Sequence, residues 1–248
     1  MSLVLYVSGN ESILKSDHFP PLHLPVEYEM ALTGLSIWNS IPNVTSDNNI
    51  FYYGAEGEKK IEIPVGSYEL NDIADYLEYK LKENETQDSK SLNNNHKELG
   101  DKSIILRGNR QTLKSELICK YLVDFTKPKN IGNILGFNSI VLPPFKMHVS
   151  NDLVNIMQVD TVRIECNIVT GSYSNGEPSH AIYEFSIGVP PGYIMIEVPK
   201  SAIYLPVFVR SISNVELRIC DQDGNLLNLR NEKTRVRLHL RPRNAYNI

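Results

Sequence analysis

The stretch that decides the fold is Arg235–Arg243, RVRLHLRPR, in which basic and apolar residues alternate one by one. Val236, Leu238 and Leu240 fall on one side of this pattern, and a period of two is the spacing of a β-strand with one face in the core. The other side carries five cationic or titratable residues, which we call the basic stripe: Arg235, Arg237, His239, Arg241 and Arg243. We expect a strand that buries its apolar face and presents the basic stripe on its other face.

The same alternation recurs upstream, and each set of alternate apolar residues is expected to face the core. The sets are Val162, Ile164, Cys166 and Ile168; Ala181, Tyr183, Phe185 and Ile187; Ile194, Ile196 and Val198; and Val215, Leu217 and Ile219. Tyr28–Trp38, YEMALTGLSIW, is apolar on both faces, as a strand in the middle of a sandwich would be. Short strands punctuated by Gly, Pro and Asn predict a mainly β protein, specifically a single jelly-roll β-sandwich.

One segment has helical rather than strand spacing. Apolar residues in Leu70–Glu83 recur every three or four positions, and Asp72 lies where the first turn favours an acid. This pattern predicts one accessory helix over about residues 70–83, packed on a sheet. The polar, Asn-rich residues 84–101 that follow predict a surface loop.

The predicted domain organisation is an N-terminal arm, residues 1–25, followed by one jelly-roll domain, residues 26–248. Residues 1–25 have an apolar start and contain Phe19-Pro20-Pro21, but they match no clear strand pattern. We expect an arm that becomes ordered on a neighbouring subunit.

Composition narrows the classes of partner. The net charge of −4 and the sequence pI near 5.9 argue against general binding to polyanions, so nucleic acid could be contacted only through the basic stripe. Three widely spaced cysteines argue for synthesis in a reducing compartment, inside the host cell. Without a signal peptide or an apolar run of membrane-spanning length, we expect a protein that is neither secreted nor inserted in a membrane.

No motif points to catalysis, a cofactor or a metal. The six histidines lack the spacing of a zinc site, and glycine-rich phosphate loops and nucleophile motifs are missing from the sequence. Asp221-Gln222-Asp223-Gly224-Asn225 is superficially similar to a calcium loop, but its glycine lies at the fourth position instead of the sixth. We interpret it as a hairpin turn, and we expect no enzymatic activity, no cofactor and no bound metal.

The basic stripe is the candidate functional feature, and it has three interpretations. It could be a solvated strand face, an interface between subunits, or a surface for nucleic acid, because arginine suits both carboxylate and phosphate partners. Like charges on one pleat repel one another, which favours an arrangement with acidic partners.

Four segments resemble one family: Glu29–Val44 (EMALTGLSIWNSIPNV), Ile63–Tyr76 (IPVGSYELNDIADY), Asn130–Phe137 with its LGF, and residues 221–241 (DQDGNLLNLRNEKTRVRLHLR). They are similar to the minor, single jelly-roll capsid (penton) proteins of the Polinton/Maverick and adintovirus group, over about residues 26–243. The resemblance implies a structural protein of the virion, viral or endogenised in a host genome. Its partners would be its own copies, as a pentamer at the capsid vertices, and a major capsid protein.

An alternative function is a β-sandwich module for ligand or carbohydrate binding, or for attachment. Such a module would need exposed aromatic residues clustered on loops. Four tyrosines are candidates for that cluster: Tyr52, Tyr53, Tyr173 and Tyr193.

Overall fold

The chain forms two compact units in a computed structural model that describes residues 1–87 and 99–243. Unit 1 combines Met1–Ile41 with Val159–Ile248, and unit 2 consists of Pro42–Gln158. Unit 2 is therefore an insertion in the chain of unit 1. In the described residues the protein is mainly β with one α-helix, as the sequence predicts.

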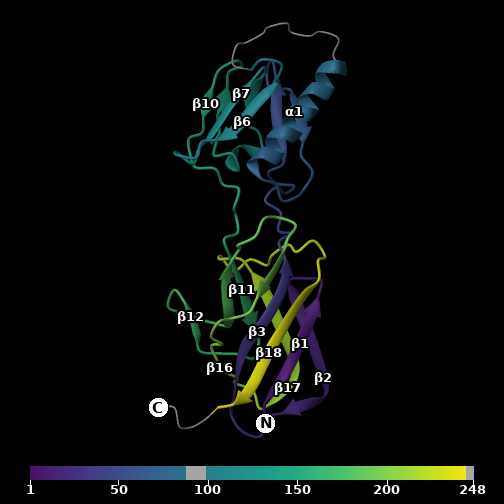
Figure 1. Cartoon of the computed structure of the whole chain (residues 1–248), viewed down its shortest axis with the longest axis vertical. Helices are drawn as coiled ribbons and strands as arrows, with labels where there is room; N and C mark the ends of the chain where they lie inside the picture. The colour runs from purple at the N-terminus through teal and green to yellow at the C-terminus, as the bar shows by residue number, and fades with distance from the viewer. Residues whose placement is uncertain (88–98, 244–248) are drawn as a thin grey trace. The chain divides into compact units, whose positions relative to one another are not determined.

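Sheet A of unit 1 is antiparallel, and the last strand of the chain lies in its interior. The strand order is β1-β18-β3-β15, and β16 also pairs with β3. Figure 1 shows β18 between β1 and β3. The bounds are β1 Leu3–Gly9, β18 Thr234–Pro242, β3 Tyr28–Trp38, β15 Ile194–Glu197 and β16 Leu205–Pro206.

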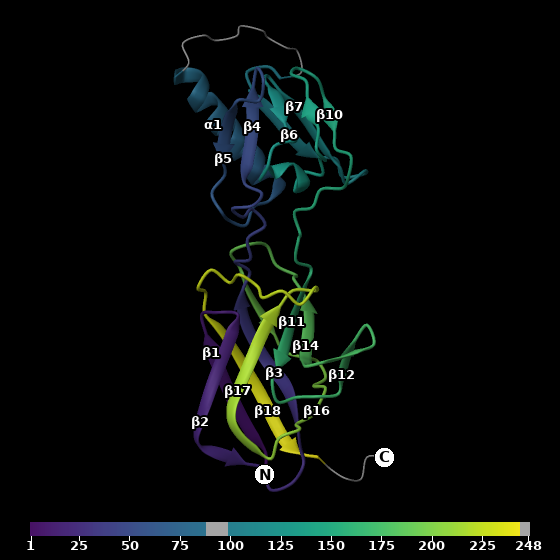
Figure 2. The same cartoon turned by 180° about the vertical axis from the view of Figure 1, so that it is seen from behind.

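Sheet B of unit 1 is also antiparallel, in the order β14-β11-β17-β2, and Figure 2 shows it from behind. Its strands are β14 Ala181–Ser186, β11 Thr161–Cys166, β17 Ser211–Cys220 and β2 Ile13–His23. A separate two-stranded hairpin of β12 (Ser172–Ser174) and β13 (Glu177–Ser179) precedes β14.

The order of the strands in unit 1 is that of a jelly roll. Numbered along the chain without β12, β13 and β16, the eight strands are arranged 1-8-3-6 in sheet A and 5-4-7-2 in sheet B. This is the order that results when one long antiparallel ribbon of strands rolls up into two facing sheets, which together contain two Greek keys. The predicted β-sandwich is confirmed, and unit 1 contains it.

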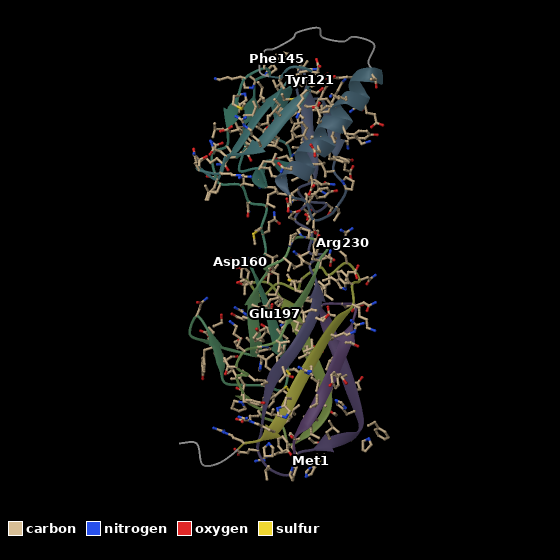
Figure 3. The ribbon with its side chains drawn as sticks, in the orientation of Figure 1. Met1, Tyr121, Phe145, Asp160, Glu197 and Arg230 are labelled. Carbon is tan, nitrogen blue, oxygen red and sulfur yellow. The ribbon has the colours of Figure 1, made fainter. Side chains whose placement is uncertain are left out.

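The two sheets of unit 1 share one hydrophobic core. Val236, Leu238 and Leu240 of β18 are at most 2% exposed and belong to the same cluster as residues of sheet B. Cys166 Sγ of β11 lies 3.9 Å from Met30 Sδ of β3, so the inner faces are in direct contact. At one edge, the Tyr183 hydroxyl of β14 donates to Glu197 of β15 at 3.3 Å; Figure 3 labels Glu197.

The N-terminal residues do not form an arm, which corrects the prediction for residues 1–25. Leu3–Gly9 pairs along its whole length with β18, and Ile13–His23 pairs with β17. The ladder with β17 is interrupted between Asp17 and Leu22, so the Phe-Pro-Pro segment lies outside it. Prolines are tolerated there because β2 is the edge strand of sheet B.

Unit 2 has two small antiparallel sheets, one helix and its own core. One sheet has the order β5-β4-β8-β9 and the other β10-β7-β6. Its buried cluster contains only residues between 44 and 142 and shares none with the core of unit 1. The bounds are β4 Ile50–Gly54, β5 Lys59–Glu62, β6 Ile104–Gly108, β7 Ser115–Cys119, β8 Leu122–Asp124, β9 Val141–Leu142 and β10 His148–Val149.

Helix α1, Leu70–Gln87, confirms the predicted accessory helix and extends it by about one turn. Ile73, Leu77 and Leu81 are fully buried in the core of unit 2. The helix is also fixed to the start of β6, because Glu78 Oε2 accepts the backbone N–H groups of Ser103 and Ile104, both at 2.9 Å. Of the predicted loop over 84–101, residues 84–87 belong to α1 instead, and residues 88–98 lie outside the described residues.

The domain extents differ from the prediction of one jelly-roll domain over residues 26–248. The jelly roll draws its strands from residues 3–38 and 161–242, and residues 42–158 form a unit with a separate core. The physical reason is that the apolar faces in 42–158 bury one another and α1, so they contribute nothing to the core of the sandwich.

Within the described residues, no helix is both long and apolar enough to span a membrane.

Candidate interaction surface on sheet A

The basic stripe lies on the outer face of sheet A. Arg235, Arg237 and Arg241 are exposed and His239 is half-buried, while Val236, Leu238 and Leu240 between them are buried. Because β18 is an interior strand, β1 flanks this face on one side and β3 on the other. The structure separates the five residues of the stripe into members that are paired within the chain and members that are not.

The C-terminal members of the stripe have acidic partners in the same chain. Arg241 Nε lies 2.6 Å from Glu29 Oε1 across the ladder with β3, and its guanidinium stacks 3.5 Å from the centre of the Tyr204 ring. Arg243 Nη1 lies 3.9 Å from Glu27 Oε2. The charge of these two arginines is therefore compensated inside unit 1.

His239 is half-buried, and its side chain is engaged by Tyr204. Its Nδ1 lies 2.7 Å from the hydroxyl of Tyr204, which packs edge-on against the imidazole ring. Tyr204 therefore contacts His239 and Arg241 together, so both side chains have partners within unit 1, although Arg241 itself is exposed.

Arg237 is held by neutral groups. Its Nη2 donates to the backbone carbonyl of Thr33 at 2.9 Å, and its Nε to Thr33 Oγ1 at 3.2 Å. Directly across the ladder is Gly34, where a Cβ would lie 3.4 Å from Arg237 Nη2. The missing side chain lets the guanidinium lie flat on the sheet, in a fixed position and with no carboxylate beside it.

Arg235 lies between two small hydroxyl residues, Ser8 of β1 and Ser36 of β3. Among the described residues, its side chain has neither a hydrogen bond nor an ion pair. Arg235 and Arg237 therefore present two positive charges that this part of the chain does not neutralise.

The outer face of sheet B shows a different arrangement. Each of its cations is matched: Arg163 pairs with Glu184, Arg218 with Glu165 at 3.2 Å, and Lys15 with Glu216 at 3.1 Å. In the strands of sheet B, all of which the structure describes, the outer face therefore has no lysine or arginine without an acidic partner. Arg235 and Arg237 distinguish the outer face of sheet A.

Apolar side chains flank the two arginines on the same face. Tyr6 of β1 is directly beside Arg237 and is 74% exposed, and Ile196 of β15, opposite Ser36, is 68% exposed. Tyrosine and arginine are enriched at protein interfaces, and a tyrosine side chain combines an apolar ring with a polar hydroxyl group. We call Tyr6, Arg235, Arg237 and Ile196 the sheet A patch. Sequence reasoning missed Tyr6. It placed Ile196 on a core-facing side with Ile194 and Val198, which is wrong, because Met195 is the buried residue of β15 and Ile196 faces outward.

The turn after β17 is built by Asp221. Its Oδ1 accepts the backbone N–H groups of Asp223 and Asn225, both at 2.9 Å, and its Oδ2 accepts from the Asn225 side chain at 3.1 Å. The carboxylate is therefore engaged in closing the turn, as the hairpin interpretation requires. In the described part of the chain, no group of three or more His, Cys, Asp or Glu side chains is arranged to hold a metal.

The cysteines are buried, and burial raises the pKa of each thiol, to about 12 for Cys119 and about 11 for Cys166. The tyrosines that could have formed an aromatic binding cluster are not equivalent. Tyr53 is 3% exposed in the core of unit 2, whereas Tyr173 and Tyr193 are exposed in unit 1. The aromatic cluster expected for an attachment module is therefore not assembled from these residues.

Comparison with known proteins gives similarity to solved structures. Neither a protein-family model nor a curated protein matches the chain. The crystal structure of SeMet-labeled mavirus penton protein aligns with 97% of this chain and 99% of that chain, with a TM-score of 0.47 and 10% sequence identity.

Proposed function

We propose that this protein is a structural capsid protein, and that it assembles through the sheet A patch of its jelly roll. The observation that carries the proposal is the 1-8-3-6 and 5-4-7-2 order of the strands in unit 1. Jelly rolls with this double-sheet arrangement are the building units of viral capsids, and also of lectins and cupins. A cupin-type enzyme would need a cluster of metal ligands, and none of three or more occurs in the described residues.

The charge of the chain supports self-association as the function of the sheet A patch. The chain has a net charge of −4, yet Arg235 and Arg237 form a locally positive, uncompensated face. A second copy carries a net negative charge, which favours its approach to this face. Contact between two different surfaces is heterologous, and it forms a closed ring where the rotation between copies closes.

The finer assignment rests on the sequence resemblance. It is that of a penton of the Polinton/Maverick and adintovirus group: a pentamer located in the virion, at capsid vertices, beside a major capsid protein. In this proposal the protein has no catalytic activity, and its function is the burial of surface between subunits.

The test removes the two uncompensated charges from the full chain. Arg235→Gln with Arg237→Gln leaves the buried face of β18 intact, so the fold should persist. If each arginine makes a charge-assisted hydrogen bond worth about 1.5–3 kcal/mol across the interface, losing both weakens each subunit contact on the order of a hundredfold or more. Native mass spectrometry and sedimentation velocity should show the parent as one closed oligomer and the double variant shifted to monomer.

The matched control is Lys15→Gln with Arg218→Gln, which removes the same charge from the outer face of sheet B. It should assemble like the parent. Rising salt should weaken the parent more than the sheet A variant, because ionic contacts are screened. Equal assembly of both variants at every salt concentration would make the basic stripe a solvated face. If the sheet A variant assembles normally but loses affinity for a DNA oligonucleotide, the patch serves nucleic acid.

A further inference from the structure

Unit 2 contains an open groove of about 820 Å³ that the capsid proposal does not use. Its lining is unusually rich in carboxamides, and its polar lining residues are Lys114, Asn133, Asn138, Asn151, Asp152 and Asn155. The volume is within the range of binding sites for small molecules and short oligomers, about 300–1,000 Å³.

Backbone contacts hold the three segments that form the groove. Asp152 N–H donates to the Gly136 carbonyl at 2.9 Å, and Val154 N–H donates to the Leu113 carbonyl at 2.9 Å. Gly136 has φ +77°, and a Cβ on it would lie 2.5 Å from the Asp152 carbonyl oxygen, so only glycine permits this approach. The groove is therefore preformed by the backbone.

The side chains that line the groove are not used to build it. In the described part of the chain, the carboxamides of Asn133, Asn138, Asn151 and Asn155 make no hydrogen bond with another residue, and neither does the Asp152 carboxylate. Elsewhere in unit 2 asparagine side chains are structural: Asn43 donates to two backbone carbonyls, and Asn130 caps the short 3₁₀ helix η1, Ile131–Asn133. The asparagine and aspartate side chains that line the groove are exposed, so they are available to water or to a ligand.

The chemistry of the lining selects a neutral, polyhydroxylated ligand. Each carboxamide offers both donors and acceptors, which matches hydroxyl groups that also do both. Lys114 and Asp152 contribute one charge of each sign, so the groove has no net charge to attract an anion, and Lys114 Nζ already donates to the Asn151 carbonyl at 2.7 Å. Leu153 and Val154 add apolar surface for the C–H face of a sugar ring.

We propose that this groove in unit 2 binds a neutral oligosaccharide through the carboxamides of Asn133, Asn138, Asn151 and Asn155. This binding is separate from assembly, since every lining residue belongs to unit 2 and the sheet A patch belongs to unit 1. The two proposals can therefore fail independently.

The experiment uses the full chain on a glycan microarray that carries neutral hexose and N-acetylhexosamine oligosaccharides together with sialylated and sulfated ones. The expected result is binding to neutral members, followed by titration calorimetry with the best neutral oligosaccharide. Asn151→Ala with Asn155→Ala should weaken this binding about ten- to a hundredfold, as loss of two hydrogen bonds does. Asn71→Ala, an exposed asparagine of α1 outside the groove, should bind like the parent.

Thermal melting of each variant shows whether it is folded, and Asn138→Ala provides a second lining variant if the double variant melts early. The proposal is overturned by an absence of binding to neutral glycans, by binding restricted to acidic glycans, or by affinity that is equal in parent and folded lining variants. Binding of extended peptides on a peptide array, with none to glycans, also overturns it.

Discussion

Leu77→Ala and Leu238→Ala should destabilise different parts of this molecule. Leu77 of α1 and Leu238 of β18 are both fully buried, but they belong to two clusters that share no residue. Truncating a fully buried leucine costs about 2–5 kcal/mol, through lost burial and the cavity that remains. For units of this size such a loss lowers the midpoint of thermal unfolding by roughly 8–20 °C.

The single tryptophan separates the two transitions. Trp38 is the last residue of β3 in unit 1, so its fluorescence reports on that unit, while calorimetry records both. Leu238→Ala should lower the transition seen by fluorescence. Leu77→Ala should leave it in place and lower a second calorimetric transition.

Tyr79→Ala is the control for Leu77→Ala, since Tyr79 is on the same helix and is 61% exposed. It should change the midpoint little. If Leu77→Ala shifts the Trp38 transition as far as the calorimetric one, the two cores unfold as a single cooperative system, and our division of the chain is energetically meaningless.

Three further predictions concern local features. The pKa of Cys119 is raised to about 12 and that of Cys166 to about 11, so at most about one thiol in a thousand is ionised at pH 8. A disulfide reagent should therefore label these two cysteines only after denaturation. Rapid labelling of the native protein would contradict their burial. Glu78→Ala removes the acceptor of two backbone N–H groups and should lower the free energy of unfolding of unit 2 by roughly 1–3 kcal/mol in urea titrations, whereas Asp75→Ala on the exposed face should not. Asp221→Ala should lower the melting temperature of unit 1, because it removes the acceptor that closes the turn. Calcium should leave the melting temperature of the parent unchanged. If calcium raises the melting temperature of the parent but not of the variant, the turn is a metal site.

Alternation in the sequence predicts strands well where pairing is regular. The segment from Val162 to Cys166 has the expected inward and outward sides, and so does β18. In β14 the expected set of Ala181, Tyr183 and Phe185 fails in part, because the register with β11 shifts and Ile182 is buried instead. A bulge adds one residue to a strand, so beyond that point the inward and outward sides of the strand are exchanged. The alternation in the sequence does not predict where a bulge occurs.

The N-terminal strands could not be predicted because their partners are distant in sequence. Leu3 pairs with Leu240, and the Phe-Pro-Pro segment resembles a break when its edge position is unknown. The candidate site has the same limit. The sequence places the arginines on one face, but only the register with β3 brings Glu29 to Arg241 and Gly34 to Arg237, and so decides which charges remain uncompensated.

The strand order also dictates when this protein can fold during its synthesis. None of β1, β2 and β3 pairs with another of the three; their ladders are made with β15, β16, β17 and β18. Unit 2 needs only residues 42–158, so it can be complete while ribosomes, at about 5–20 residues per second, are still making the rest. The first three strands must then wait, unpaired, for residues beyond 193, and β1 must wait for residue 234. A nascent chain in that interval exposes strand edges, which makes it a target for chaperones and prone to pairing with the nascent chains of neighbouring ribosomes.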